Sequence, residues 1–594
     1  MDDYSFIQKE LVLFFFNSFR KTNKDDIIFL EQHLHHVLSL LKTNIHANGD
    51  AIVGQTWIPY LKKFYQLMAH TRDQILGKGE HDITYMMIRV WYQYFPALAI
   101  YFIFSLVSDD FGFYAKDHVN ESNRILALGS WRDMKYLCLD VSEHKSNASI
   151  ITYCISIMNK QLKHDIDNVK RGVFPISKVA KWIPRENSRR FGWLFTELVI
   201  DFFKTYQPYL LKDPNIRAIN KCKMLYRKYL SQLNSIIDTT QIKQCSRDYK
   251  SIMPESVSKY TLMKQPKLYT DDAIACHDNF KRFLSKKYGL DDRGDGCGDD
   301  LDSLCINVNP VKMHLPVAYY IKQAFELLKL KKSLGDGFSI ADFNYKVKIL
   351  NKQWNLFSKC MSLKMKHDHY IPLVDVSESM RAFDSESFYT GIGLAILFSK
   401  NSFFKNRILA VDHSSTWIHC GGEDHDANDD LFNMIETIDQ QIVSSSSTQF
   451  DIKKAINFLV YAIQCTKLNL TNIDKIKIVI FSDFSKPDNY YEIIKKQFSL
   501  RYILNVKSFH MPSLIFWNLS KTGIVDLPCP VDQSKTMVLS GLSQIFDSDV
   551  AGGGGAKGCG DINPYIGACN ILGQNRYRMF DTYIDKIVNH DFSL

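Results

Sequence analysis

From residue 367 onward, apolar strands alternate with amphipathic helices, and this alternation limits the possible folds more than any other feature of the sequence. Strands are expected at residues 369–376, 407–412, 416–420, 476–481, 513–517 and 537–540, with helices at 388–399, 451–465 and 490–500. Parallel strands need a long crossover connection, usually a helix, so the alternation favours a doubly wound, mainly parallel sheet. Such sheets bind ligands at the carboxyl ends of their strands.

The first 365 residues follow a different pattern. Apolar residues recur at a spacing of three or four in segments at 6–19, 27–41, 52–69, 83–107, 148–162, 317–331 and 340–359. No alternating strand of comparable length separates these segments, although no regular internal repeat is evident. Consecutive amphipathic helices predict an all-α helical array of the HEAT-like kind.

These patterns predict a multidomain chain. The expected parts are an α-helical array at 1–365 with an acidic, glycine-rich loop near 287–309, an α/β domain at 366–550, a glycine-rich linker at 551–560 and a C-terminal segment at 561–594. The acidic loop is similar in composition to a calcium-binding loop, but Asp302 stands where an EF-hand needs glutamate, which favours a surface loop. A helix at 576–588 is expected to pack back on the α/β domain.

Cysteine usage and apolar runs indicate the compartment. The 13 cysteines are scattered and form no CxxC pair, which is typical of reduced thiols rather than a disulfide framework or zinc site. The first residues, Met1-Asp2-Asp3, are unlike a signal peptide. The longest apolar run, at 95–107, is too short to cross a bilayer. We therefore expect an intracellular, cytoplasmic protein without a membrane span, or a virion component if the chain is viral.

Three loop segments place hard oxygen ligands after expected strands. Asp375, Ser377 and Ser379 follow the first strand as a DxSxS motif, Thr448 precedes a helix, and Asp483 follows the strand at 476–481. Carboxylate and hydroxyl oxygens at one sheet edge suit Mg²⁺, or alternatively Mn²⁺ or Ca²⁺. We therefore predict a divalent-metal site that could engage a protein carboxylate. The alternative is that these residues only cap turns and helices.

Positive charge concentrates in residues 151–250, which hold 19 Lys and Arg against 8 Asp and Glu. Cations interleaved with aromatic residues suit structured or single-stranded RNA. The alternative is a solvated helical face packed on acidic neighbours. The candidate nucleic-acid-binding residues are Lys181, Trp182, Arg185, Arg189, Arg190, Lys221, Lys223, Arg227 and Lys228.

The five metal-site residues resemble the metal-ion-dependent adhesion site of von Willebrand factor A domains, with Glu378 adding a charge beside it. A helical half followed by such a domain resembles the Ro/TROVE ribonucleoproteins, and more closely a Ro-like family from plants, fungi, protists and large DNA viruses. The family's landmarks are similar to Arg72-Asp73, Gly77-Lys78-Gly79-Glu80, Gly129-Ser130-Trp131-Arg132-Asp133, Lys181-Trp182-Ile183-Pro184, Tyr226-Arg227-Lys228, Phe516-Trp517-Asn518 and Ser540-Gly541-Leu542-Ser543.

The resemblance implies a non-enzymatic, Ro-like binding protein with RNA held by the basic helical half and a metal-dependent ligand site in the A domain. The alternative is a metal-dependent protein-interaction scaffold, or a virion structural component, without RNA binding. Neither half contains a nucleophile and base at a recognisable spacing. The His413 beside Asp412 is better explained as a loop contact than as a catalytic pair, so we expect no enzyme activity.

Overall fold

The computed structural model describes residues 3–46, 51–107, 127–211, 215–253, 257, 261, 265, 316–333, 340–362, 369–382, 384–402, 404–412, 415–421, 430–442, 450–466, 476–486, 488–500, 511–541 and 562–591. Contacts divide the chain into two compact units. Unit 1 comprises Met1–Thr71, Ile75–Lys78 and Lys286–Phe580, and unit 2 comprises Arg72–Gln74, Gly79–Ser285 and Asp581–Leu594. In this grouping the first 71 residues belong with the sheet.

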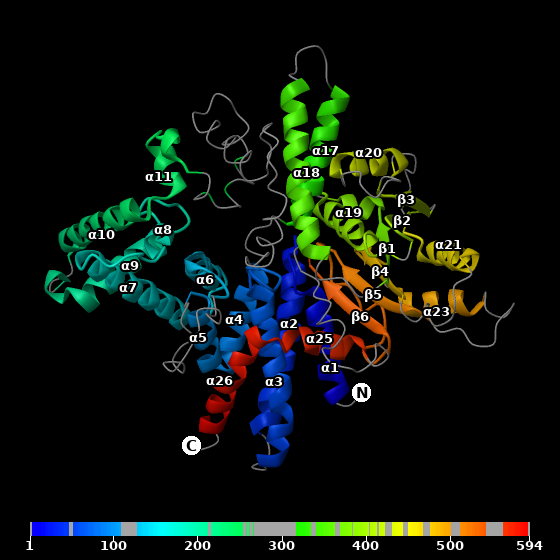
Figure 1. Cartoon of the computed structure of the whole chain (residues 1–594). Helices are drawn as coiled ribbons and strands as arrows, with labels where there is room; N and C mark the ends of the chain where they lie inside the picture. Colours follow the sequence, from blue (N-terminus) through cyan, green and yellow to red (C-terminus); the bar gives the residue numbers. More distant parts are fainter. Residues whose placement is uncertain are drawn as a thin grey trace. The chain divides into compact units, whose positions relative to one another are not determined.

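The sheet of unit 1 has six strands in the order β3-β2-β1-β4-β5-β6 (Figure 1). All neighbouring strands are parallel except β2 and β3, which are antiparallel. The order reverses between β1 and β4, because the chain builds outward on one side of β1 and then on the other. The strands are β1 (His369–Asp375), β2 (Arg407–Val411), β3 (Thr416–His419), β4 (Ile476–Ser482), β5 (Ser513–Asn518) and β6 (Thr536–Ser540).

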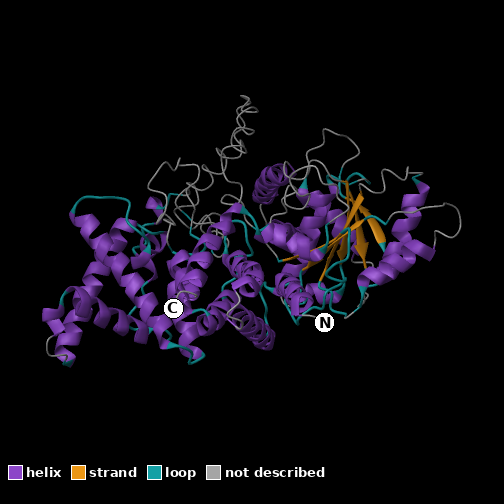
Figure 2. Ribbon diagram, turned by 90° about the horizontal axis from the view of Figure 1, so that it is seen from below, coloured by secondary structure: helices purple, strands orange, loops and turns teal. Residues whose placement is uncertain are grey.

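Helices lie on both sides of the strands (Figure 2). Successive side chains of a strand point to opposite faces, so the Tyr370 ring contacts Phe398 on one face while Ile371 joins the apolar cluster on the other. That cluster also holds Ile456 and Ile494 from two covering helices. The covering helices are α19 (Glu386–Ser399) on the first face, with α21 (Ile452–Cys465) and α23 (Tyr490–Leu500) on the second.

A further layer of helices packs outside α19. A Cβ atom built on Gly393 of α19 would lie 2.6 Å from Val317 and 2.9 Å from Ile321, so glycine lets two helices approach closely here. The layer consists of α17 (Val317–Ser333), α18 (Ile340–Ser362) and α20 (Leu431–Ile442). Unit 1 also includes α1 (Asp3–Asn17), α2 (Lys24–His46), most of α3 (Ala51–Arg72), α25 (Pro564–Leu572) and the first residues of α26 (Asn575–Asp591).

The last turn of α1 docks on the carboxyl ends of β5 and β6 (Figure 1). Carbonyl groups at a helix C-terminus lack partners within the helix and need outside donors. Asn518 Nδ2 donates to Phe16 O at 2.9 Å, and Ser540 Oγ donates to Phe15 O at 2.8 Å. Lys78 Nζ donates to both Phe15 O and Ser540 Oγ. Side chains at the ends of the last two strands, β5 and β6, therefore cap α1.

Unit 2 is helical in its described residues. Neighbouring helices pack in pairs, with α6 on α7, α7 on α9 and α9 on α10. The helices are α4 (Asp82–Tyr94), α5 (Pro96–Ser105), α6 (Trp131–Glu143), α7 (Ala148–Lys170), α8 (Val179–Trp182), α9 (Gly192–Tyr206), α10 (Ile216–Ile237) and α11 (Thr240–Cys245). Two 3-10 turns, η2 (Pro208–Leu211) and η3 (Tyr249–Ser251), also belong to this unit, as does the part of α26 from Asp581 onward.

The expected coarse architecture is confirmed: helices dominate the first half, and a mixed α/β sheet follows. The single helix expected at 83–107 is two helices, α4 and α5, that meet at Phe95. Proline has no N–H group and begins helices readily, and Pro96 is the first residue of α5. In the described part of the chain, no helix is long and apolar enough to cross a membrane. The segments at 287–309 and 551–560 lie outside the described residues.

The C-terminal segment contacts two parts of unit 1. Helix α25 packs on α1 and β6. The first residues of α26 lie on α3 instead, where the Tyr577 ring meets His70 at 5.7 Å between centroids and Phe580 meets Tyr65 at 5.3 Å. The helix expected at 576–588 corresponds to α26, whose first residues contact α3. The contact with β6 comes from α25, a helix that the sequence pattern did not predict.

Candidate metal centre and basic surface

Two predicted metal ligands meet where the strand order reverses. Asp375 is the last residue of β1, and Asp483 directly follows β4, the strand paired with β1. At such a switch point the connections on either side of the two strands run to opposite faces, which leaves a crevice at the carboxyl edge. The topology therefore brings together two carboxylates that lie 108 positions apart in the sequence.

The Asp375 carboxylate is fully buried and held on both oxygens. Its Oδ1 accepts a hydrogen bond from Ser377 N at 2.9 Å, and its Oδ2 accepts one from Ser482 Oγ at 2.6 Å. The hydroxyls of Ser377 and Ser379 are 3.0 Å apart. Ser377 is buried whereas Ser379 is exposed, so the hydroxyl pair runs from the buried carboxylate to the surface.

The two carboxylates influence each other electrostatically. Burial and the nearby charge of Asp483 raise the pKa of Asp375 to about 7. Burial also raises the pKa of Tyr490, with further contributions from Asp488, Asp375 and Asp483. Like charges in a poorly solvated place disfavour each other, and a bound cation would relieve this repulsion.

The donor set suits a hard divalent cation. Asp375, Ser377, Ser379 and Asp483 present only carboxylate and hydroxyl oxygens, which are the ligands that Mg²⁺ and Ca²⁺ prefer. No group of three or more His, Cys, Asp or Glu side chains gathers in a metal-binding arrangement among the described residues. Thr448, the fifth predicted ligand, lies outside the described residues.

Ser482 is a member of this cluster that the sequence analysis missed. Its hydroxyl donates to Asp375 and accepts from Phe484 N at 3.1 Å. Ser482 precedes Asp483 at the end of β4, so its position was readable from the sequence. Its role was not readable, because the pairing of β4 with β1 decides which side chain of the neighbouring strand Ser482 meets.

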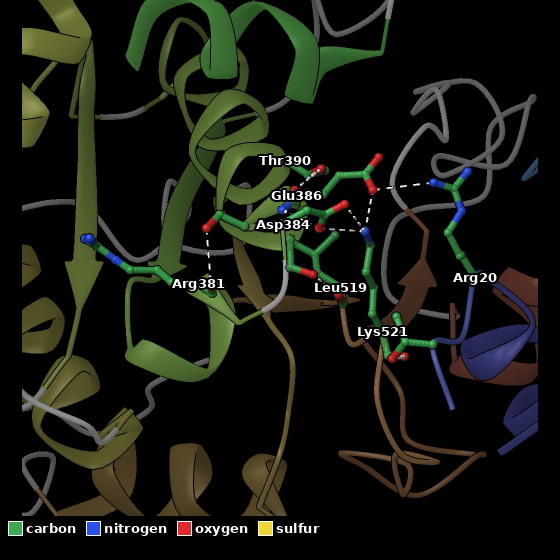
Figure 3. Close-up of polar contacts among 10 residues, drawn as sticks. Arg20, Arg381, Asp384, Glu386, Thr390, Leu519 and Lys521 are labelled. Carbon is green, nitrogen blue, oxygen red and sulfur yellow. Dashed lines mark hydrogen bonds and ion pairs between the residues drawn. The ribbon is translucent and has the colours of Figure 1, made fainter. Parts of the chain in front are cut away.

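Two carboxylates that follow the DxSxS motif, Asp384 and Glu386, pair with Lys521 (Figure 3). The ammonium of Lys521, which is 7% exposed, lies 3.0 Å from Asp384 and also pairs with Glu386. Burial opposes ionisation of Asp384, but Lys521 outweighs it and lowers the pKa of that carboxyl. Arg20 adds a second ion pair to Glu386 at 3.4 Å. These two carboxylates are therefore held by cations of the protein itself.

The loop that carries Lys521 is fixed by the N-terminal segment. Asn17 exchanges two hydrogen bonds with the backbone of Val525, each 2.9 Å long. Lys21 Nζ donates to Ser520 O at 3.2 Å and to Gly523 O at 2.8 Å. Burial lowers the pKa of Lys21 to about 8, against the opposing effect of Asp26. The segment after α1 thus shapes one wall of the sheet's carboxyl edge.

The landmark motifs near residues 72 and 133 form a buried ion pair within unit 2. Asp133 Oδ2 accepts from Arg72 Nη2 at 2.6 Å, and both side chains are 0% exposed. Tyr85 Oη and Ser130 N donate to the same carboxylate at 2.7 Å. Burial would raise the pKa of Asp133, but Arg72 and His81 outweigh it and hold the pKa below the ordinary range. These residues brace helices rather than face a ligand.

The predicted basic residues separate into paired and unpaired groups. Lys223 lies 3.4 Å from Glu186, and Arg227 pairs with the same carboxylate. Arg190 lies 3.3 Å from Glu143. The remaining cations form no ion pair within the described part of the chain; they are Lys181, Arg185, Arg189, Lys221 and Lys228. Four of these five are exposed, and Lys181 beside Trp182 is half-buried.

Comparison with protein families places one match on the sheet. Residues 369–546 match a family described as a domain of unknown function (DUF7788). The matched segment begins with β1 and runs past β6, so it covers the sheet and all the described candidate metal ligands. A comparison with curated proteins found no match, and neither did a comparison with solved structures.

Proposed function

We propose that this chain is a non-enzymatic binding protein of the von Willebrand factor A type, which captures an acidic group through a divalent cation. The observation that carries the proposal is the buried Asp375 carboxylate beside Asp483, with two serine hydroxyls leading to the surface. Oxygen ligands on the protein side leave coordination positions open on the solvent side, where a carboxylate can enter.

Each residue has a distinct part in the proposal. Asp375 and Asp483 supply the negative charge, and Ser377 and Ser379 supply neutral oxygens. Ser482 orients Asp375 through its 2.6 Å hydrogen bond. Mg²⁺ is the expected ion, and it would supply a positive charge that attracts and fixes a partner carboxylate. The partner on this hypothesis is a protein, so the chain acts as an interaction scaffold.

Isothermal titration calorimetry with Mg²⁺ and Mn²⁺ tests the site. Asp375→Ala should abolish binding of the ion, because it removes a central charged ligand. Asp384→Ala is the matched control, since that carboxylate lies nearby but is held by Lys521. Loss of binding in both variants, or in neither, would contradict the proposed ligand set.

RNA binding by unit 2 is a second candidate, which corresponds to the Ro-like reading of the sequence. It is favoured by exposed cations without ion pairs among the described residues, namely Arg185, Arg189, Lys221 and Lys228. Fluorescence anisotropy with labelled RNA over a salt series tests it. Affinity should fall as salt rises, because phosphate contacts release counterions. A flat response, or no binding near physiological salt, would refute it.

A further inference from the structure

One lysine of unit 2 lies among three aromatic rings. Lys135 Nζ is 4.6 Å from the ring centroid of Phe191, 5.0 Å from that of Tyr136 and 5.5 Å from that of Trp182. The rings come from α6, α8 and the start of α9. Ring faces attract a cation but carry no net charge. The three rings therefore stabilise the ammonium of Lys135 but do not neutralise its charge.

Further cations surround this lysine. The guanidinium of Arg132 lies 4.9 Å from the Tyr136 ring, and Lys181 Nζ lies 5.8 Å from the Trp182 ring. Burial and Arg132 lower the pKa of Lys135, and burial and Lys178 lower that of Lys181. The positive groups thus repel one another in a partly desolvated place.

The acidic residues of α6 are engaged elsewhere. Asp133 is bound by Arg72, Asp140 lies 2.7 Å from Arg89, and Glu143 pairs with Arg190. In the described chain, none of the cations Arg132, Lys135, Lys178 and Lys181 forms an ion pair with a carboxylate. We call Arg132, Lys135, Lys178 and Lys181, with the rings of Tyr136 and Trp182, the Lys135 cluster. It combines several unneutralised cations with aromatic surface.

We propose that the Lys135 cluster binds the phosphates of a single-stranded nucleic acid, with its bases against Tyr136 and Trp182. Both rings are half-buried, so each keeps solvent-accessible area. A nucleic-acid single strand offers regularly spaced phosphates together with the π-faces of its bases. The cations of the Lys135 cluster suit the phosphates, and its rings suit the bases. An acidic peptide offers the anions without the stacking bases, and a duplex hides its bases. The inference rests on the RNA-binding candidate above and assigns it a site that includes Arg132 and Lys135.

The test uses the full chain and fluorescence anisotropy with a labelled 12-nucleotide RNA. Lys135→Gln should weaken binding at least tenfold and make the slope of log K against log salt shallower by about 0.7, the value for one phosphate contact on a single strand. Trp182→Leu should weaken binding without changing that slope. Lys160→Gln is the matched control, because Lys160 is an exposed lysine of α7 with no ion pair among the described residues, and it should change affinity less than twofold.

Two further measurements separate folding from binding. Circular dichroism should be the same for Lys135→Gln and wild type, and Lys135→Arg should restore most of the affinity because it keeps the charge. A single-stranded DNA of the same sequence distinguishes recognition of the strand from recognition of the ribose. Binding of RNA alone would assign RNA, and equal binding of both would assign single strands in general.

Each failure has a different meaning. If wild type binds RNA and Lys135→Gln behaves like Lys160→Gln, the Lys135 cluster is the wrong site although RNA binding stands. If wild type binds no oligonucleotide near physiological salt, both proposals are refuted. Competition by polyglutamate as strong as that by RNA would overturn the nucleic-acid assignment in favour of an acidic protein. Tighter binding of a duplex would overturn the single-strand assignment.

Discussion

The buried ion pair between Arg72 and Asp133 gives a stability prediction with a magnitude. Asp133→Asn keeps the shape of the side chain but removes its charge. Arg72 Nε and Nη2, now 3.0 and 2.6 Å from the carboxylate, would face a neutral amide. Removing one partner of a buried pair costs about 3–5 kcal/mol, because the other charge stays buried without compensation. Since Ser130 N also loses its acceptor at Oδ2, we expect Asp133→Asn to lower the free energy of unfolding of unit 2 by about 4 kcal/mol.

The assay must report on unit 2 alone, because a chain of two units does not unfold in one step. Hydrogen exchange measured by mass spectrometry on peptides of α4 and α6 provides that readout. Asp140→Asn is the matched control on the same helix. Its carboxylate pairs with Arg89 but keeps 18% exposure, so the expected cost is about 1 kcal/mol.

The double variant Arg72→Met/Asp133→Leu should lower the free energy of unfolding less than Asp133→Asn does, because it leaves no unpaired charge buried.

The pH dependence of the stability has a defined sign. The pKa of Asp133 is depressed in the folded state, so the stabilisation is complete above the ordinary Asp pKa of about 4 and is lost as pH falls below it. A cost under about 1 kcal/mol for Asp133→Asn, or a double variant less stable than the single one, would refute the reasoning.

Three further predictions concern unit 1. Asn518→Leu leaves Phe16 O without its donor and should cost about 1–3 kcal/mol, seen as faster proteolysis within α1; unchanged cleavage would contradict the docking. Gly393→Ala forces a methyl to 2.6 Å from Val317 and should lower thermal stability by about 1–3 kcal/mol, whereas Gly567→Ala, whose nearest contact is 3.3 Å to a flexible methionine, should cost less. Because the pKa of Lys21 falls from 10.5 to about 8 on folding, the buried ammonium opposes folding below pH 8. Wild type should therefore gain up to about 3 kcal/mol over Lys21→Met between pH 8 and 10.5 in urea unfolding, and parallel pH profiles would exclude this.

The sheet could be predicted well from the sequence because local signals agree. Strands β1 and β4 are mostly apolar. Asp375 ends β1 and Asp483 directly follows β4, so both the strands and the aspartates at their carboxyl ends were readable. The strand order was not readable, since it depends on which runs pair. The prediction of a metal ligand at Thr448 stays a prediction.

The sequence pattern could not predict contacts between distant single residues. Arg72 and Asp133 are 61 positions apart, and neither position differs locally from an ordinary helix cap. The break at Phe95 was missed for another reason. The apolar pattern continues through it, although Pro96 marked the start of a new helix. The Lys135 cluster was predicted only in part. Lys181 and Trp182 lie in the basic window, but Arg132 and Lys135 lie outside it, and only the packing of α6 on α8 brings them to Lys181.

The docking of α1 on the last strands has a consequence for synthesis of the chain. Phe15 O and Ser540 Oγ are separated by 525 residues, so α1 leaves the ribosome long before its partners exist. At about 5–20 residues per second, the delay is roughly 30–100 s. Until β1 is made, Val12 and Phe16, which belong to the apolar cluster of the sheet, have no strand to cover them. Residues 79–285, which form most of unit 2, are translated in between. The contacts between α1 and the sheet therefore form only after the last strands are made, so β5 and β6 complete a structure that α1 begins.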